Sequence, residues 1–184
     1  MFFGYLKAFL FSPDAMLSTH DQLQDVTFTQ AAIDSQKDIL IFSIDRNFSY
    51  RTFNNAFVSA TSFAYGTQVT RGMNLFDSIT TESDRSKARA NCDRAFSGEK
   101  HYTVEKYGTL NPAIYETHYI PIVSSTGDVI GVSVLSSNIT ARVVAEQQVQ
   151  TLTKELESFT YTSSRLARAI TCYQRIFENT TGRL

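Results

Sequence analysis

The stretch "YETHYIPIVSSTGDVIGVSVLSSNIT", residues 115–140, carries the strongest fold information in the chain. Aromatic and β-branched residues alternate with polar ones on both sides of "SSTGD" (124–128), which is typical of a hairpin turn. We therefore expect two adjacent antiparallel strands. The preceding "KHYTVEKYG" (100–108) alternates in the same way and predicts a third strand.

Two further strands are expected earlier in the chain. "DILIFSID" (38–45) is a short apolar run closed by Asp45-Arg46-Asn47, and "FSYRTF" (48–53) alternates aromatic with polar residues. The pair predicts a hairpin.

Helical sequence separates the two groups of strands. Residues 54–66 end at Gly66, and residues 82–99 carry acids in the first turn with Gly98 just past the end. Residues 20–36 predict an amphipathic lead-in helix that contains Leu23 and Val26. The order predicts an α+β fold, a five-stranded antiparallel sheet with helices on one face and a small cavity between them.

Composition limits the function classes. The chain has 184 residues and a formal net charge of −1, and its arginines are scattered, so we expect no nucleic-acid partner. Cys92 and Cys172 lie far apart without a CxxC pattern, which predicts neither a disulfide framework nor a zinc site. A reducing, cytoplasmic location fits this cysteine usage.

The apolar opening "MFFGYLKAFLF" (1–11) is about half the length of a membrane span, so no transmembrane segment is expected. It also lacks the basic start and cleavage site of a signal peptide. Two interpretations stay open: a helix that packs on its own domain or dimer mate, or contact with a membrane surface.

Three segments resemble, in order and spacing, the S-box type of PAS domain found in bacterial sensor proteins. They are "DILIFSIDRNFSYRTFNNAF" (38–57), "GMNLFDSITTESDRSKARANCDRAFSGE" (72–99) and residues 115–140. The resemblance implies an N-terminal helical extension (1–36), a sensory PAS domain (37–140) and a C-terminal signalling helix (141–184). Asn138 departs from the family pattern, which usually has an aspartate that ties the last strand to the exit helix.

PAS domains hold flavin, haem, metabolites, metals or nothing, so the cofactor is unknown from the resemblance alone. "NCDR" (91–94) is superficially similar to the flavin-linked Asn-Cys-Arg of light sensors, but it lies on the later helix without the flanking pattern. Residues 82–97 contain no histidine that could bind haem. Flavin and haem are therefore disfavoured, and Glu116 with His118 gives too few ligands for a metal.

The aromatic residues could line a cavity for an apolar or aromatic metabolite, although core packing explains most of them equally well. A cluster of Tyr102, Tyr115 and His118 is predicted as the place for a ligand or an ordered water. The predicted ligand-binding residues are Tyr50, Asn54, Tyr102, Tyr115 and His118. Nucleophile–base patterns and phosphate-binding glycine loops are absent from the sequence, so we do not expect an enzyme.

From Thr140 to Asn179 the sequence has no glycine or proline and predicts one long helix. Its apolar residues recur in steps that alternate three and four, with Ser163 in the one gap, which predicts a parallel homodimeric coiled coil. A helix that folds back on its own domain is the alternative. The predicted seam consists of Val149, Leu152, Leu156, Phe159, Leu166, Ile170, Tyr173 and Phe177.

"ELESFTYTSSRLARAI" (155–170) resembles the start of the dimerisation and phosphotransfer helix of histidine kinases, with Arg165 in the position of the phosphoacceptor histidine. Arginine stays protonated and cannot accept phosphate as imidazole does, and no ATP-binding domain follows, so autophosphorylation is not expected. The resulting hypothesis is a sensory module that dimerises and transmits a ligand or partner state through its exit helix. The alternative is a ligand-free PAS protein that regulates a full-length sensor kinase.

Overall fold

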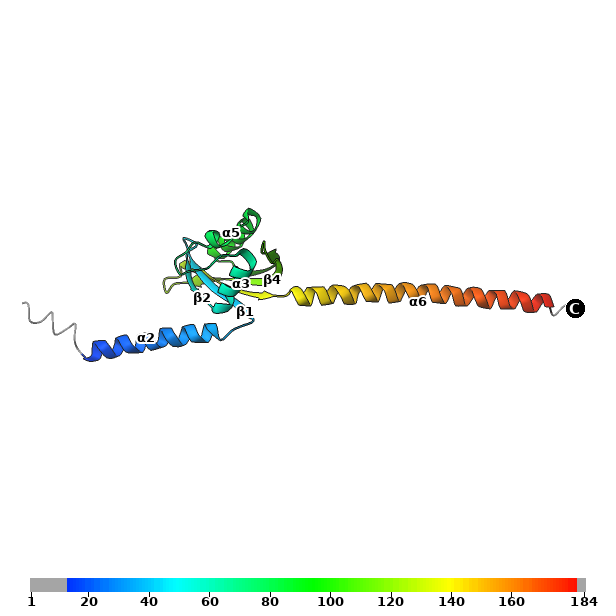
Figure 1. Ribbon diagram of the computed structural model, residues 1–184, viewed down its shortest axis with the longest axis horizontal. Helices are drawn as coiled ribbons and strands as arrows, with labels where there is room; N and C mark the ends of the chain where they lie inside the picture. The colour runs from blue at the N-terminus through cyan, green and yellow to red at the C-terminus, as the bar shows by residue number, and fades with distance from the viewer. Residues whose placement is uncertain (1–12, 182–184) are drawn as a thin grey trace, which may run out of the picture. The chain divides into compact units, whose positions relative to one another are not determined.

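The computed structural model describes residues 13–181 (Figure 1). The chain divides into two compact units, one ending at Ile139 and one beginning at Thr140. The apolar segment 1–11 lies outside the described residues.

The first unit is built on one antiparallel sheet in the order β2-β1-β5-β4-β3. The predicted five-stranded α+β architecture is confirmed. Hydrogen bonds pair β5 with β1 over the whole length of β1, with Ile41 opposite Leu135, so the first and last strands lie side by side at the centre. The strands are β1 (Ile39–Asp45), β2 (Tyr50–Phe53), β3 (His101–Tyr107), β4 (Ala113–Val123) and β5 (Val129–Asn138).

The two faces of the sheet differ in burial, because successive side chains of a strand point to opposite faces. The inner face carries the core residues Phe42, Ile44, Tyr119, Val132 and Val134, all buried. The outer face of the same strands is mixed: His118 is exposed, Ser43 is buried, and Ile41, Ser133 and Leu135 are half-buried.

The helices α3 (Asn55–Tyr65), α4 (Leu75–Ser78) and α5 (Glu82–Phe96) lie between β2 and β3 in the chain and pack against the inner face (Figure 1). Gly66 ends α3 in the left-handed region at φ 73°, which a glycine adopts without strain. Asn74 caps α4 by accepting a hydrogen bond from the Phe76 amide. The four-residue α4 is too short to leave a periodic pattern, and the sequence did not indicate it.

Aromatic side chains pack α3 against the sheet. The rings of Phe42 and Phe57 stack with their centroids 4.4 Å apart, and Tyr50 meets Phe42 edge to face at 5.6 Å. Such pairs contribute about 0.5–1.5 kcal/mol beyond the apolar area that they bury.

Helix α2 (Pro13–Asp34) precedes the sheet; it begins before the predicted lead-in helix (20–36) and ends two residues earlier. Its C-terminal part contacts both β2 and α3. Gln30 Nε2 donates to the carbonyl of Phe53, the last residue of β2, at 3.0 Å, and Asp34 Oδ1 accepts from the Asn55 amide at the start of α3 at 2.8 Å. Leu23 and Val26, two of the apolar residues on which the amphipathic prediction rested, are both exposed.

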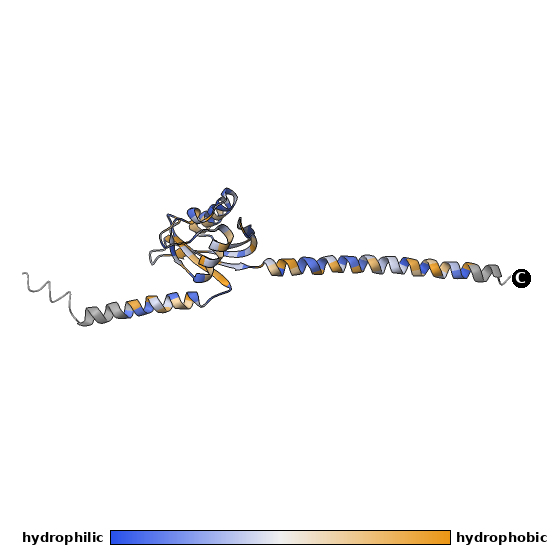
Figure 2. Cartoon of the chain, viewed as in Figure 1, coloured by the Kyte–Doolittle hydropathy of each residue, from blue (hydrophilic) through white to orange (hydrophobic). Residues whose placement is uncertain are grey.

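The second unit is α6 (Thr140–Thr181), a single helix of 42 residues, which confirms the predicted long C-terminal helix. Figure 2 shows apolar residues recurring between polar ones along its whole described length. None of the helices in residues 13–181 combines the length and apolar character needed to cross a membrane.

Candidate functional site

A cavity of about 100 Å³ lies between the inner face of the sheet and the helices that cover it. Every strand and each of α3, α4 and α5 contributes to its wall, and no lining side chain carries a charge at neutral pH. The lining residues are Leu40, Phe42, Tyr50, Phe57, Ala60, Thr61, Ala64, Tyr65, Leu75, Ser78, Ile79, Ala88, Cys92, Tyr107, Tyr115, Thr117, Tyr119, Val134 and Ser136.

Most hydroxyl groups of the wall are already hydrogen-bonded to each other. The Tyr50 and Ser78 hydroxyls are 2.8 Å apart, and Thr117 Oγ1 lies 2.7 Å from Ser136 Oγ. Burial raises the pKa of Tyr50, so its phenol stays protonated. These pairs stabilise the wall without needing a ligand.

Two hydroxyl groups of the wall form no hydrogen bond with any described residue: those of Thr61 and Tyr115. Thr61 is 7% exposed, and burial raises the pKa of Tyr115. Both lie near Tyr65, because Thr61 precedes it by one helical turn and Tyr115 is close enough to affect the pKa of the Tyr65 phenol. Neither hydroxyl is among the fully enclosed side-chain atoms that lack a partner in the described residues, which are Thr81 Oγ1 and His101 Nε2, so both are accessible and this end of the cavity can offer hydrogen bonds to a ligand.

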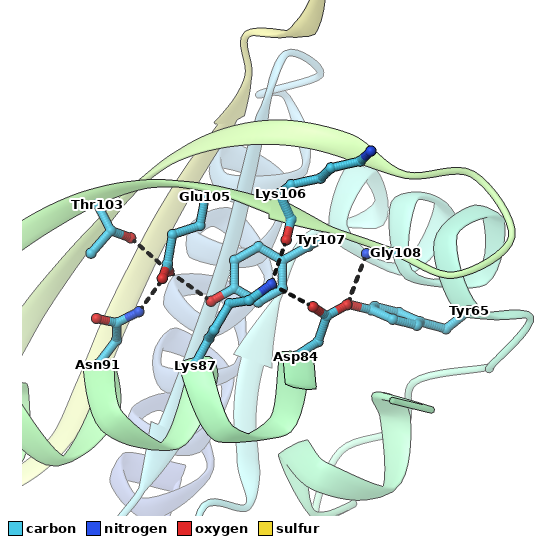
Figure 3. A network of polar contacts seen from close by, with 9 residues as sticks. All are labelled: Tyr65, Asp84, Lys87, Asn91, Thr103, Glu105, Lys106, Tyr107 and Gly108. Carbon is cyan, nitrogen blue, oxygen red and sulfur yellow. Dashed lines mark hydrogen bonds and ion pairs between the residues drawn. The ribbon is translucent and has the colours of Figure 1, made fainter. Parts of the chain in front are cut away.

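A polar network joins α5 to β3 beside the cavity, and Figure 3 shows its two carboxylates. The first is Asp84, whose Oδ2 accepts from the Tyr65 hydroxyl at 2.7 Å and the Gly108 amide at 3.0 Å, while Oδ1 accepts from Lys87 Nζ at 2.7 Å. Lys87 Nζ also donates to the Lys106 carbonyl at 2.8 Å. The network thus connects α3, α5 and the end of β3.

The electrostatics of this cluster follow from its contacts. Burial alone would raise the pKa of the Asp84 carboxyl, but hydrogen bonds from Lys87, Tyr65 and Gly108, with the Lys87 charge, lower it below its usual value. Burial and then the bonded Asp84 carboxylate raise the pKa of Tyr65. The carboxylate is therefore ionised and the phenol protonated at neutral pH.

Gly108 fits this position for steric reasons. Its φ is 105°, and a Cβ there would lie 2.9 Å from the Asn111 carbonyl oxygen and 3.2 Å from the Ala64 Cβ. A side chain would therefore strain the backbone and push the β3–β4 loop away from α3.

The second carboxylate is Glu105, whose Oε2 accepts from Asn91 Nδ2 at 2.8 Å, Tyr107 at 3.0 Å and Thr103 at 3.1 Å (Figure 3). The Tyr107 phenol also lies close enough to the Tyr119 hydroxyl to affect its pKa. Burial, followed by the Tyr119 and Glu105 neighbours, raises the pKa of Tyr107. Tyr65 and Tyr107 thus line the cavity, and each donates a hydrogen bond to a carboxylate outside its wall, Asp84 and Glu105 respectively.

Cys92 lines the cavity from α5 and is 1% exposed. Burial raises the pKa of its thiol to about 12, so the group is neutral and a poor nucleophile. Its place in the wall was not anticipated from "NCDR", because periodicity gives a helix but not which sheet strand faces it.

The predicted cluster of Tyr102, Tyr115 and His118 does not form. Tyr115 lines the cavity, whereas Tyr102 and His118 are exposed and lie opposite each other on β3 and β4, with ring centroids 5.7 Å apart. Residues 115 and 118 are an odd number apart on one strand, so their side chains point to opposite faces. His118 Nε2 lies 3.5 Å from Glu116 Oε1 on that face. In the described part of the chain, no three potential metal ligands gather.

Asn54 was predicted to bind a ligand, but its side chain forms hydrogen bonds with backbone groups. Its Nδ2 donates to the carbonyls of Gln36 and Ile39, and its Oδ1 accepts from the amides of Ile41 and Phe57. The fully buried amide has no remaining hydrogen-bonding capacity for a ligand, and Asn54 is outside the cavity wall. Tyr50, the neighbouring prediction, does line the cavity.

The apolar seam of α6 is exposed in this chain. Every seam residue from Val149 to Tyr173 is more than half exposed, and the side chain of Phe177 lies outside the described residues. Arg165 is also exposed, with its guanidinium carbon 5.9 Å from the centre of the Tyr161 ring.

Several solved structures share this fold. An RNA-binding light-oxygen-voltage receptor matches with TM-score 0.51 and 22% identity over 72% of this chain, and a phage VqmA–DPO complex with TM-score 0.52 and 14% identity over 72%. A sensory box histidine kinase from Vibrio cholerae matches over 70% of this chain and 95% of its own, at 14% identity and TM-score 0.44.

The chain spans 38% of the light-oxygen-voltage receptor and 60% of the VqmA chain. No curated protein sequence matches it. The family model described as the PAS fold matches residues 33–144, which is more than half of the chain and includes the whole sheet with its helices. The chain therefore belongs to the PAS fold family.

Proposed function

We propose that this chain is a sensory module of the two-component type that dimerises through α6 and transmits the state of its PAS cavity along the paired helices. The observation that carries the proposal is the exposed apolar seam on one uninterrupted 42-residue helix. An isolated helix of this kind gains little from its own hydrogen bonds, and packing of its apolar face supplies the stability.

The seam has the spacing of a two-stranded coiled coil. Val149, Leu156, Ser163 and Ile170 occupy one heptad position, and Leu152, Phe159, Leu166 and Tyr173 the other. Full burial of a leucine or phenylalanine contributes on the order of 1.5–3 kcal/mol. The polar Ser163 in the middle weakens the seam locally, as in helices whose pairing has to change.

The cavity is connected to α6 through β5. Val134 and Ser136 line the cavity, and only residues 137–139 separate Ser136 from the first residue of α6. Ile139 is buried, and its amide donates to the Ile114 carbonyl at 2.8 Å. A shift of β5 on ligand binding would therefore change how α6 begins, which gives the two-state coupling that signalling needs.

We further propose that the output passes to a sensor kinase rather than through catalysis by this chain. The resemblance of residues 155–170 to the phosphotransfer helix supports a shared helical partner, while Arg165 rules out phosphate transfer at that position. The thiols of Cys92 and Cys172 are free, which suits the reducing cytoplasm.

A ligand-sensing role is favoured over the ligand-free alternative by the cavity wall. A protein that acts only by pairing would be expected to fill its core, whereas here the Thr61 and Tyr115 hydroxyls border open space without a partner among the described residues.

The dimer is tested with Leu156→Asp and Phe159→Asp combined. Each charge would face its copy in the seam, so the variant should sediment as a monomer at micromolar concentration while native protein sediments as a dimer. The control is Tyr161→Asp, an exposed residue at the position opposite the seam. A variant that stays dimeric would contradict the proposed interface.

Helix direction is tested by a cysteine placed away from the middle of the seam. In a parallel pair Val149 meets its own copy, so Val149→Cys in a Cys172→Ser background should form an intermolecular disulfide under mild oxidation. In an antiparallel pair residue 149 would lie near residue 177 instead, and that variant would remain uncrosslinked.

A further inference from the structure

We propose that the cavity takes a small, uncharged, mostly apolar molecule with one hydrogen-bonding group, which Thr61 and Tyr115 bind. This inference rests on the proposed sensory function, because it names the ligand class of the same cavity.

The charge of the ligand follows from the wall. Lysine, arginine, histidine and carboxylate side chains are all absent from the lining residues. The nearest carboxylates are already engaged, Asp84 with Tyr65, Lys87 and Gly108, and Glu105 with Asn91, Thr103 and Tyr107. An ion would lose its hydration shell without a counter-charge, which costs several kcal/mol, so carboxylates, phosphates and amines are excluded.

The polarity of the ligand follows from the hydroxyls. Four hydroxyls of the wall are hydrogen-bonded to each other, Tyr50 to Ser78 and Thr117 to Ser136. The wall along the sheet and α4 therefore offers a ligand mainly apolar contacts. Thr61 and Tyr115 offer two hydroxyls that can both donate and accept at the end of the cavity near Tyr65. A carbonyl, hydroxyl, amide or ring nitrogen placed there would satisfy both.

The size of the ligand follows from the volume of about 100 Å³. An engineered apolar cavity of about 150 Å³ holds benzene, and drug-sized ligands occupy about 300–1,000 Å³. The present cavity is smaller than both, so its ligand is no larger than a single ring or a short chain. Flavin or haem would require α3 and α5 to move away from the sheet.

The test uses two matched pairs of probes with the whole 184-residue chain. Phenol and toluene have the same shape but only phenol has a hydrogen-bonding group, and butyramide and butyrate differ in charge. Amide chemical-shift changes in the NMR spectrum give the site and the Kd of each probe. We expect phenol to bind about threefold to tenfold tighter than toluene, and butyramide at least about tenfold tighter than butyrate.

The variants Thr61→Val and Tyr115→Phe remove the two hydroxyls with little change of shape. Each should weaken phenol binding to the level of toluene, while Thr61→Val should leave the melting temperature of the free protein unchanged or higher, because it removes a buried hydroxyl without a partner among the described residues. The control is Tyr102→Phe on the outer face, which should bind phenol as the native protein does.

Equal or tighter binding of butyrate, no binding of any probe to folded protein, or unchanged phenol binding in both variants would each overturn the ligand class. These outcomes do not test the proposed dimer, because sedimentation of the native protein measures pairing through α6 independently. Loss of the dimer with phenol still bound would contradict the proposed function alone.

Discussion

The two units of this chain treat their apolar residues in opposite ways. In the PAS unit, Ile44, Val132 and Val134 are at most 1% exposed, whereas Leu156, Phe159 and Leu166 of α6 are all more than 60% exposed. The first unit has a hydrophobic core of its own, whereas the second exposes the apolar face of its helix. The difference indicates that the PAS unit can fold alone, and it supports the proposal that α6 is stabilised by a partner helix.

The largest effect is expected from Val134→Asp. The residue is 1% exposed at the centre of the sheet, so a buried carboxylate without a partner should lower the free energy of unfolding by on the order of 4 kcal/mol. Chemical denaturation followed by circular dichroism measures it. A decrease in the free energy of unfolding of less than about 1 kcal/mol would show that water reaches this position in the core.

Asn54→Ala should have the next largest effect. It leaves two carbonyls and two amides at the junction of α2, β1 and α3 without their side-chain partner, which should cost about 2–4 kcal/mol. The adjacent Asn55→Ala is the control, since Asn55 is exposed. Equal melting temperatures for the two variants would contradict the structural role of Asn54.

Asp84→Asn should destabilise the protein by about 1–2 kcal/mol at neutral pH. The folded state lowers the pKa of this carboxyl below its ordinary 3.8, so its contribution is present above that value and is lost as the pH falls through the lower folded pKa. Denaturant titrations at pH 7 and pH 3 should therefore show a smaller difference between variant and native protein at pH 3. The exposed Glu82→Gln is the control, and a pH-independent difference for Asp84→Asn would argue against an ionised Asp84.

The smallest effect is expected from Leu166→Asp, the same type of change as Val134→Asp but on α6. Because Leu166 is exposed, the free energy of unfolding of the PAS unit should change by less than about 0.5 kcal/mol when measured on monomer at low concentration. A large loss would mean that α6 belongs to the core of the first unit after all.

Local patterns predicted most of the architecture. The apolar run 38–45 and the alternation in residues 48–53 and 100–140 anticipated all five strands. "SSTGD" anticipated a turn, in which Gly127 has φ 90° and the Ser124 amide donates to the Asp128 carbonyl at 2.8 Å. Turn chemistry and strand periodicity are properties of neighbouring residues, so the sequence alone shows them.

The cavity could be predicted only in part, because its wall is assembled from residues far apart in the chain. Tyr50 and Tyr115 were anticipated, but Thr61 and Cys92 depend on which turn of each helix faces the sheet. The prediction that Asn54 binds a ligand was wrong. Its side chain bonds backbone groups as far away in the chain as Gln36, 18 residues earlier, and the residues next to Asn54 do not reveal such partners. The network of Asp84 and Glu105 depends in the same way on the packing of α5 against β3.

Gly108 gives a means of recognising proteins that share this arrangement. Its amide bonds both the Tyr65 hydroxyl and the Asp84 carboxylate, and the position does not tolerate a Cβ. A glycine here, a tyrosine at the end of α3 and an aspartate in the first turn of α5 should accordingly be inherited together or lost together. In a set of related sequences, co-variation of these three positions would mark the branch that keeps the same closure between α3, α5 and the β3–β4 loop.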